Sequence, residues 1–349
     1  MTTHQQEKKI AVLHVTPPGA FPGGAERFVR SLAEALGRKG ASVRIVEQLS
    51  DESSIESVLR SYSHFYHMDL SGFDAVISTK SPAHMVRHHN HVCYLQHTMR
   101  QFYDRFTEAH PQPTADQQRL RDIILALDRR TLRPPWIRQL YVVGKAVQSR
   151  LQHFTGLDSE VLYQGHSLAI AGSNRQNYFL MPGRLHSWKR VDLALAAMAK
   201  ARTNLRLIIS GSGDDEQRLR ELAGSDSRIV FAGHATDGEL RRLYAETLAV
   251  LVVPKSEDFG LTVLEAFSAG KPVITCKDAG EPAELVNRGR CGMVVPPDAR
   301  HIAEALDYLS EHREEAASMG DLGRRFLRRF DWETTARSLM LALWDDATP

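Results

Sequence analysis

The sequence predicts an α/β fold of two doubly wound domains, each a parallel sheet covered by helices, which face each other across a cleft. Short apolar runs bounded by Gly and Pro alternate with segments of helical periodicity along the chain. The connections between them are too short for folds rich in hairpins. With 349 residues, the chain is long enough for two domains of about 150 to 180 residues each.

Composition excludes several classes of protein. Charged residues make up 25% of the chain and the net charge is +2, so no overall field attracts nucleic acid and we expect no nucleic-acid partner. The three cysteines, Cys93, Cys276 and Cys291, are widely spaced in apolar contexts, which indicates reduced thiols and argues against a disulfide frame or a zinc site. The first residues are polar, and no apolar run approaches the roughly 20 residues of a membrane span. We therefore expect a soluble cytoplasmic protein, which could still lie on the inner face of the cell membrane.

In the first half, a buried strand over 10–15 leads through a loop rich in Pro and Gly to a helix over 25–36. Gly23 and Gly24 in this loop form either an ordinary tight turn or a close backbone approach to a ligand phosphate. Further strands are expected over 43–46, 73–78, 92–95, 140–143 and 161–166, and helices near 53–63, from 119 onward as far as Pro134, and over 146–154.

Several histidines fall around the strand over 92–95. His84 and His88 have the spacing of metal ligands on a helix, but no acid or cysteine lies near them in the sequence, so we expect no metal there. The strand itself ends at His97 and Arg100. Because the carboxyl ends of parallel strands line a cleft, these two side chains are candidates for a polar wall, although a lone histidine is as often structural.

A basic cluster and a polar run follow. Arg129, Arg130, Arg133 and Arg138 surround Trp136, a pattern that could dock on anionic lipid but is more commonly a solvated face. The polar run 171–177 is the best domain linker. We therefore expect a first domain over 1–170, a second over 171–330, and a last segment, 331–349, whose helix over 332–344 crosses back to the first domain.

The second half repeats the alternation. Strands are expected over 178–181, 205–210, 229–232, 248–253, 272–275 and 293–295, and helices over 191–201, 217–223, 237–247, 282–286 and 303–309. The loop after its first strand carries Arg184 and Lys189. A ligand bound in the cleft would contact this loop. An arginine holds phosphate oxygens bidentately and a lysine adds a point charge, so the pair can stabilise a diphosphate leaving group. The alternative is two surface cations beside an acidic neighbour.

The most informative stretch runs from Ser256 to Ile274, a loop followed by an amphipathic helix. Glu257 in the loop and Glu265 in the second helical turn can both face the cleft. Between them, the backbone N–H groups of Phe259-Gly260-Leu261-Thr262 would lie at a helix N-terminus, which favours a phosphate. Carboxylates accept from sugar hydroxyls, so a nucleotide sugar fits. The alternative is that these acids only cap the helix or lie in solvent.

Three motifs in this order resemble the retaining glycosyltransferases of family 4, with their two-domain GT-B architecture of Rossmann-like domains, over nearly the whole chain. Gly23-Gly24-Ala25-Glu26 is similar to the first Gly-Gly loop of that family, and Gly183-Arg184-Leu185 with Lys189-Arg190 to its diphosphate-binding loop. The segment from Glu257 to Glu265, with Ala269-Gly270-Lys271-Pro272-Val273 behind it, is similar to its paired-glutamate motif.

The resemblance implies a role for each matched residue. Arg184 and Lys189 would bind the donor diphosphate, Glu257 the hydroxyls of the donor sugar, and Glu265 the nucleotide ribose. Gly23, Gly24 and the backbone of 259–262 would lie along the phosphates, and Gly233 is a further donor-binding candidate. The segment from Tyr94 to Arg100 resembles a bacterial Tyr-x-His-Thr-Pro-x-Arg segment, with an extra residue and no proline, and places His97 beside the transferred sugar and Arg100 on the acceptor side.

The implied reaction transfers a hexose-like sugar from a UDP- or GDP-sugar to an acceptor hydroxyl with retention, while the leaving diphosphate takes the acceptor's proton. No Asp-x-Asp motif stands at a strand end, so we expect neither a metal nor another cofactor. The acceptor would be a glycan or glycolipid of cell-surface polysaccharide synthesis, or a small natural product. A GT-B nucleotide-sugar epimerase and a carbohydrate-binding protein without catalysis are the alternatives.

Overall fold

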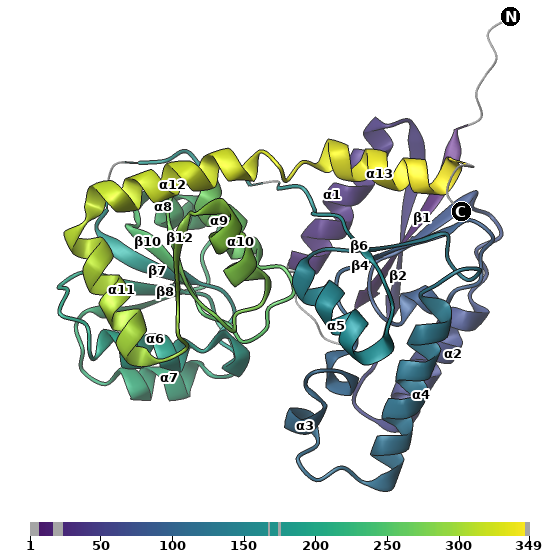
Figure 1. Cartoon of the computed structure of the whole chain (residues 1–349), viewed down its shortest axis with the longest axis horizontal. Coiled ribbons are helices and arrows are strands. Elements are labelled where there is room, and N and C mark those ends of the chain that lie inside the picture. Colours follow the sequence, from purple (N-terminus) through teal and green to yellow (C-terminus); the bar gives the residue numbers. More distant parts are fainter. Residues whose placement is uncertain (1–6, 17–23, 167, 174–175, 346–349) are drawn as a thin grey trace, which may run out of the picture. The chain divides into compact units, whose positions relative to one another are not determined.

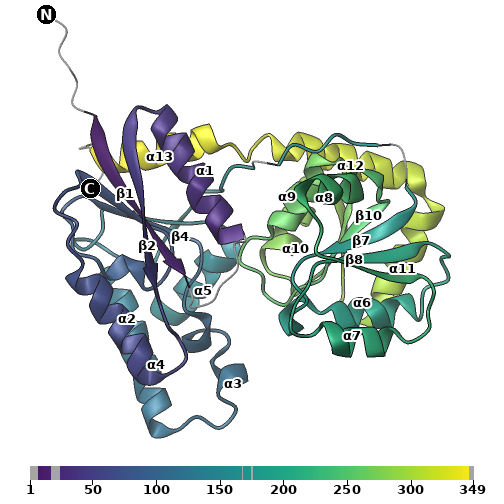
Figure 2. The same ribbon diagram turned by 180° about the vertical axis from the view of Figure 1, so that it is seen from behind.

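The computed structural model describes residues 7–16, 24–166, 168–173 and 176–345. The chain forms two compact units (Figures 1 and 2): unit 1 extends to Gly165 and resumes at Asp331, and unit 2 comprises His166–Phe330. The boundary therefore precedes the polar run that the sequence analysis took for a linker. The start of the run is bound within unit 2: the N–H of Ile170, just before it, donates to Ser268 Oγ (3.0 Å), and Lys271 Nζ donates to the Ser173 carbonyl (2.9 Å).

Unit 1 contains a 6-stranded parallel sheet in the order β2-β1-β3-β4-β5-β6. Its strands are β1 (Lys8–Thr16), β2 (Ala41–Leu49), β3 (Ala75–Ser78), β4 (His91–Leu95), β5 (Gln139–Val142) and β6 (Glu160–Val161). β1 lies between β2 and β3. It is apolar from Ile10 to Leu13, and these residues are fully buried because helices cover both faces of the sheet. The expected strand over 161–166 is reduced to the two residues of β6.

The helices of unit 1 are α1 (Gly24–Arg38), α2 (Ile55–His67), α3 (Phe106–Ala109), α4 (Ala115–Thr131), α5 (Lys145–Thr155) and α13 (Trp332–Trp344), with short 3-10 turns at Ala83–Met85 and Arg100–Phe102. α1 buries one stripe, which includes Phe28, Leu32 and Leu36, as its periodicity predicts. α4 begins earlier than position 119 because Thr114 and Gln117 form a capping box.

A buried carboxylate joins α2, α4 and the loops after β3 and β4. Asp128 is fully buried and accepts from Tyr62 (3.0 Å), His84 (2.9 Å) and Tyr103 (2.6 Å). His84 thus has an acidic partner 44 residues away, which the sequence analysis did not find. His88 instead lies against the carbonyls of Phe73 and Asn90, so the two histidines do not share one helix face.

α13 packs beside α1 within unit 1 (Figures 1 and 2). Trp332 meets Phe28 edge to face at 5.4 Å, and Glu333 pairs with Arg38 and Lys39 at 2.9 and 2.6 Å. Arg138, a member of the basic cluster, donates to the carbonyls of Ala342 and Asp345 at the end of α13. Its guanidinium therefore helps to hold α13 in place, and the contact of the cluster with anionic lipid stays a prediction.

Unit 2 contains a second 6-stranded parallel sheet in the order β12-β11-β10-β7-β8-β9. Its strands are β7 (Tyr178–Pro182), β8 (Arg206–Ser210), β9 (Ile229–Gly233), β10 (Ala249–Val252), β11 (Val273–Cys276) and β12 (Gly292–Val295). The chain winds outward from β7 to β9 and then returns to β10 on the other side of β7. This is the Rossmann strand order, and its switch point lies between β7 and β10.

The helices of unit 2 are α6 (Val191–Met198), α7 (Glu216–Ala223), α8 (Asp237–Glu246), α9 (Leu261–Ser268), α10 (Glu281–Gly289), α11 (Ala299–Glu311) and α12 (Arg313–Leu327). The sequence analysis did not expect α12. This helix packs on α9 through glycines: a Cβ at Gly320 would lie 2.0 Å from the Gly270 carbonyl oxygen, and one at Gly323 would lie 2.8 Å from the Phe267 ring. Its contact with α9 depends on backbone proximity, which apolar periodicity does not reveal.

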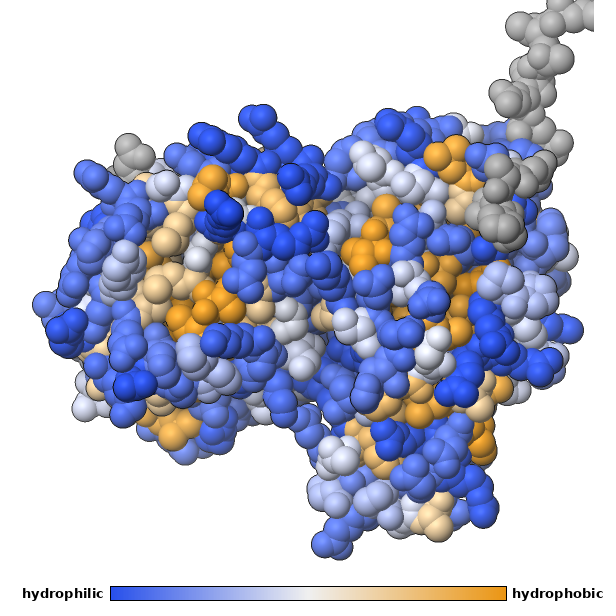
Figure 3. Space-filling view, viewed as in Figure 1, coloured by the Kyte–Doolittle hydropathy of each residue, from blue (hydrophilic) through white to orange (hydrophobic). Residues whose placement is uncertain are grey.

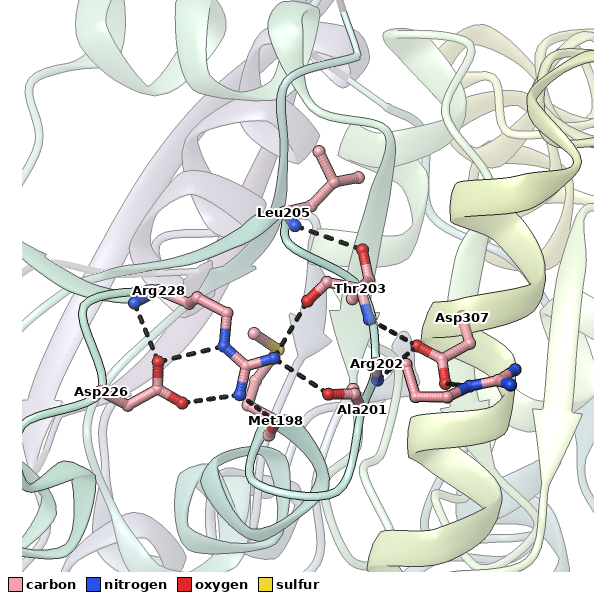
Figure 4. A network of polar contacts seen from close by, with 8 residues as sticks. All are labelled: Met198, Ala201, Arg202, Thr203, Leu205, Asp226, Arg228 and Asp307. Carbon is pink, nitrogen blue, oxygen red and sulfur yellow. Dashed lines mark hydrogen bonds and ion pairs between the residues drawn. The ribbon is translucent and has the colours of Figure 1, made fainter.

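A polar network closes the end of unit 2 where β8 begins (Figure 4). Arg228 binds Asp226 and donates to the carbonyls of Met198, Ala201 and Thr203. Asp307 accepts the N–H groups of Arg202 and Thr203, each at 2.8 Å. These contacts satisfy backbone groups of the loop between α6 and β8 at the amino-terminal edge of the sheet.

Hydrophobic side chains on the face shown in Figure 3 form separated patches among hydrophilic residues on both units. Within the part of the chain that the structure describes, no helix has the length and apolar character needed to cross a bilayer.

Candidate functional site

The candidate site lies in unit 2 at the carboxyl ends of β7 and β10, the two strands that flank the switch point. A pocket opens there between the loops that follow these strands. It is lined by Met181, Pro182, Gly183, Arg184, Leu185, Lys189, Val191, Leu251, Val252, Val253, Pro254 and Thr262. The fold thus brings Arg184, Lys189 and the first turn of α9 to one pocket, at the position where doubly wound sheets bind ligands.

Glycines hold the Arg184 loop in place. Gly183 has φ of 138°, and its N–H donates to the Ser210 carbonyl at 2.9 Å. A Cβ at Gly211 would lie 1.9 Å from the Gly183 carbonyl oxygen, and one at Gly213 would lie 2.3 Å from that of Leu185. Only glycine allows the loop after β8 to approach so closely, and this contact fixes the backbone on both sides of Arg184.

Lys189 and Glu257 meet directly. Lys189 ends a 3-10 turn at Ser187–Lys189, and Glu257 lies in the loop after β10. Their Nζ and Oε2 atoms are 2.5 Å apart, and each side chain retains about a quarter of its exposure (26% and 25%). The pair therefore couples a cation suited to phosphate with a carboxylate suited to hydroxyls at one solvent-accessible point.

Arg190 is a positioning residue that the sequence analysis placed in the loop motif without a role of its own. Its backbone is left-handed (φ 52°), an unfavourable conformation for a residue with a Cβ. The guanidinium donates to the Val253 and Pro254 carbonyls at 2.7 and 2.6 Å and holds Asp278 bidentately at 2.8 Å. These bonds compensate the strain and join the end of β10 to the 278–281 segment.

The loop that carries Glu257 is bound to this segment on its other side. Glu257 and Gly280 form a parallel bridge: the Glu257 N–H donates to Ala279 at 2.7 Å, and the Glu281 N–H donates to Glu257 at 3.0 Å. A Cβ at Gly280 would lie 2.4 Å from the Glu257 carbonyl oxygen. Glu257 is thereby fixed from both directions, although it lies outside any helix or long strand.

α9 begins at Leu261 after Gly260, which has φ of 82° and leaves the first turn without a side-chain cap. Thr262 in that turn lines the pocket. Phe259 is buried and packs on Phe330 at 6.4 Å, so only its backbone is a candidate for ligand contact. An uncapped N-terminus of this kind favours an anion through unpaired N–H groups and the helix dipole.

Glu265 lies in the second turn of α9, as expected, but it is 5% exposed. Its Oε2 accepts from the hydroxyl of Tyr244 in α8 at 2.6 Å. Gly233 ends β9, two strands away from β7, where its carbonyl accepts from the Gly211 N–H at 2.7 Å. The structure therefore assigns Gly233 a contact with the loop after β8, and its proposed contact with the donor stays a prediction.

Unit 1 carries the remaining predicted residues at the carboxyl ends of its strands. Gly23 lies outside the described residues, and Gly24 is the first residue of α1. His97 follows β4 and is partly buried, and its carbonyl accepts from the Ser81 N–H at 3.3 Å. Arg100 is bound to Asp104, which also holds Arg150 at 3.0 Å, so its charge is already engaged by a neighbour.

Two further titratable side chains of unit 1 lie at the same edge of the sheet, and the sequence analysis did not identify them. His14, at 4% exposure, lies 3.7 Å from Glu26, and burial lowers its pKa. Lys80 follows β3, and burial also lowers its pKa. The negative charges of Glu52 and Glu26 raise this pKa, but by less. β1 and β3 flank the switch point of this sheet, so both groups lie where a second ligand would bind.

Parts of the chain are similar to known glycosyltransferases. Residues 169–326 match the family model described as Glycosyl transferases group 1. The chain is 31% identical over 212 residues to D-inositol 3-phosphate glycosyltransferase of Corynebacterium glutamicum, and the alignment covers 55% of this chain and 50% of that protein. It is 30% identical over 166 residues to O-antigen chain mannosyltransferase C of Escherichia coli, which covers 46% of this chain and 43% of that protein.

Two solved structures resemble the whole chain. Sucrose-phosphate synthase of Thermosynechococcus elongatus has a TM-score of 0.76 at 19% identity, covering 96% of this chain and 98% of that one. HepE of Anabaena in complex with UDP and glucose has a TM-score of 0.70 at 18% identity, covering 97% and 99%. The fold is therefore the two-domain GT-B fold, as predicted.

The match to the family model lies entirely within unit 2. Unit 2 carries a glycosyltransferase domain, and the prediction of a transferase is confirmed at the level of this domain. The chain spans half or less of the length of the first curated relatives it matches, with 18%, 50% and 45% of those proteins covered.

Proposed function

We propose that this protein is a retaining glycosyltransferase that moves a hexose-like sugar from a UDP- or GDP-sugar to an acceptor hydroxyl. One observation carries the proposal: Arg184, Lys189 and the first turn of α9 line one pocket at the switch point of unit 2, with Glu257 bound to Lys189. Two cations and a helix N-terminus suit a diphosphate, and the carboxylate suits the sugar hydroxyls beside it.

In the proposed reaction, Arg184 and Lys189 stabilise the negative charge that grows on the diphosphate as the bond to the sugar breaks. Glu257 orients the sugar through its hydroxyls. The diphosphate accepts the proton of the acceptor hydroxyl on the same face, so that the configuration is retained, and no metal takes part. His97 is proposed to lie beside the transferred sugar on the side of unit 1.

The acceptor is proposed to be a glycan or glycolipid of the cell surface. The O-antigen mannosyltransferase to which the chain is similar supports this class by its name, and HepE supports a UDP-sugar donor by the ligand in its structure. Cys93, Cys276 and Cys291 are buried thiols, which suits the reducing cytoplasm where we place the reaction. A small soluble acceptor is the alternative.

A thermal-shift screen with UDP, GDP and ADP and their glucose and mannose conjugates, with and without EDTA, tests the proposal. A nucleotide at 100 times its dissociation constant stabilises the fold by about 2.7 kcal/mol. We expect one nucleotide family to stabilise the wild type and not Arg184→Ala, with EDTA having no effect. Arg206→Ala, which removes an exposed cation at the start of β8, is the matched control and should respond like the wild type. No response of the wild type to any nucleotide would refute the proposal.

A further inference from the structure

The hydrogen bond from Tyr244 to Glu265 joins two residues that are both buried, in different helices. Tyr244 is fully buried in the last turns of α8, and Glu265 is 5% exposed in α9. The phenol oxygen and Oε2 are 2.6 Å apart, a distance typical of a strong bond to an ionised carboxylate. A buried carboxylate needs such hydrogen-bond donors, because its burial without them lowers the stability of the folded state.

The position of Glu265 along α9 relates this hydrogen bond to the pocket. Thr262 lines the pocket, and Glu265 follows it by one helical turn, so the two side chains lie on the same side of α9. Glu265 is thus placed behind the point where the diphosphate is proposed to bind. In a nucleoside diphosphate, the group one step beyond the diphosphate is the ribose with its two hydroxyls.

We propose that Tyr244 is the positioning residue that makes Glu265 select a ribonucleotide: it holds Oε2 so that the carboxylate presents a fixed orientation to the ribose hydroxyls. This inference rests on the proposed function, because it requires a nucleoside diphosphate in the pocket. Tyr244 itself contacts no ligand. Its effect is to reduce the reorganisation that ribose binding requires of Glu265.

This role differs from a merely structural one in its consequence. A site built to bond a hydroxyl rejects the analogue that lacks it by a large factor, since its own polar group is then left unpaired. If Tyr244 only supported packing, its loss would weaken ribose and deoxyribose nucleotides equally. If it orients Glu265, its loss reduces the preference between them.

The test is isothermal titration of UDP, 2′-deoxy-UDP and 3′-deoxy-UDP into three proteins: the wild type, Tyr244→Phe and Tyr178→Phe. If the screen selects guanine, the GDP series is used. Tyr178 donates its hydroxyl to the Leu243 carbonyl at 3.0 Å, so Tyr178→Phe removes a comparable phenol hydroxyl of unit 2 whose hydrogen bond goes to the backbone. Tyr244→His, which keeps a ring donor on the same position, is the rescue variant, and thermal unfolding checks that each variant is folded.

We expect the wild type to prefer UDP over a deoxy analogue by about tenfold or more. In Tyr244→Phe the preference should fall by about tenfold, the equivalent of one lost hydrogen bond, while Tyr178→Phe keeps it and Tyr244→His restores part of it. Equal preference in Tyr244→Phe and the wild type overturns the inference, as does a wild type with no preference. In both of those cases UDP still binds; a wild type that binds no nucleotide instead refutes the proposed function and the inference with it.

Discussion

Lys189 and Glu257 are 68 residues apart in the sequence, yet their charged atoms lie 2.5 Å apart at the carboxyl edge of the unit 2 sheet. The contact exists because β7 and β10 are neighbours in the sheet although two strands separate them in the chain. Each partner is fixed by its own loop: Lys189 by the 3-10 turn next to Arg190, and Glu257 by its bridge to Gly280.

The two members of this pair should affect different parts of the reaction. We expect Lys189→Ala to weaken UDP binding by about tenfold or more, because it removes a charge from the diphosphate. Glu257→Gln should lower the rate of sugar transfer by about 100-fold and leave the dissociation constant of UDP equal or lower, since Lys189 is released from its partner. Titration calorimetry and initial rates measure both. Equal losses of UDP affinity in the two variants would contradict the assignment.

Arg190 should stabilise unit 2 despite its left-handed backbone. Replacing it with glycine relieves strain but removes its bonds to Val253, Pro254 and Asp278, so we expect the free energy of unfolding to fall by about 2 kcal/mol. Arg290→Gly is the matched control: Arg290 also has a left-handed backbone (φ 51°) at the end of α10. There the free energy of unfolding should rise by about 0.5 kcal/mol, because strain is relieved without comparable loss. Urea unfolding measures both, and a stabilising Arg190→Gly would rule out the clamp.

Gly165 should be essential for the docking of α13 in unit 1. A Cβ at this position would lie 2.2 Å from Trp332 Cγ and 2.4 Å from the Trp332 backbone nitrogen. We expect Gly165→Ala to lower the free energy of unfolding by about 1 to 3 kcal/mol and to expose the segment after Asp331 to limited proteolysis. Gly72→Ala, at a site with nothing within 4 Å of the added Cβ, should leave both unchanged. An unaltered cleavage pattern in Gly165→Ala would show that the helix docks without this contact.

His91 should make unit 1 sensitive to acid. Burial, followed by the nearby charges of His84 and His88, lowers its pKa from 6.5 to about 3. Between these values the unfolded chain binds a proton and the folded chain does not, so stability is lost as pH falls below 6.5. From pH 7 to pH 5 we expect a loss of about 2 kcal/mol from this group.

Urea unfolding at pH 7 and pH 5 tests the prediction. The difference in unfolding free energy between the two pH values should shrink in His91→Gln by about 2 kcal/mol and stay as in the wild type in His89→Gln, whose histidine is exposed. The same pH dependence in His91→Gln and the wild type would assign the acid sensitivity to another group.

The sequence by itself determined the fold class and most of the elements of unit 2, because fully buried parallel strands appear in a sequence as short apolar runs bounded by Gly and Pro. The last helix was read correctly from Trp332 to Trp344. Arg184, Lys189 and Glu257 could be predicted as site residues because their residue types and loop positions indicate phosphate and hydroxyl chemistry.

The tertiary structure alone decided which side chains are engaged and by what. Asp128 beside His84, Asp104 between Arg100 and Arg150, and Tyr244 on Glu265 all join residues from different elements. The packing of α12 on α9 depends on glycine backbones in contact. Partners of this kind are set by how strands are ordered and how helices cross, and neither leaves a local periodicity in the chain. For this reason the sequence predicted where the site lies, and the structure determined what holds its residues in place.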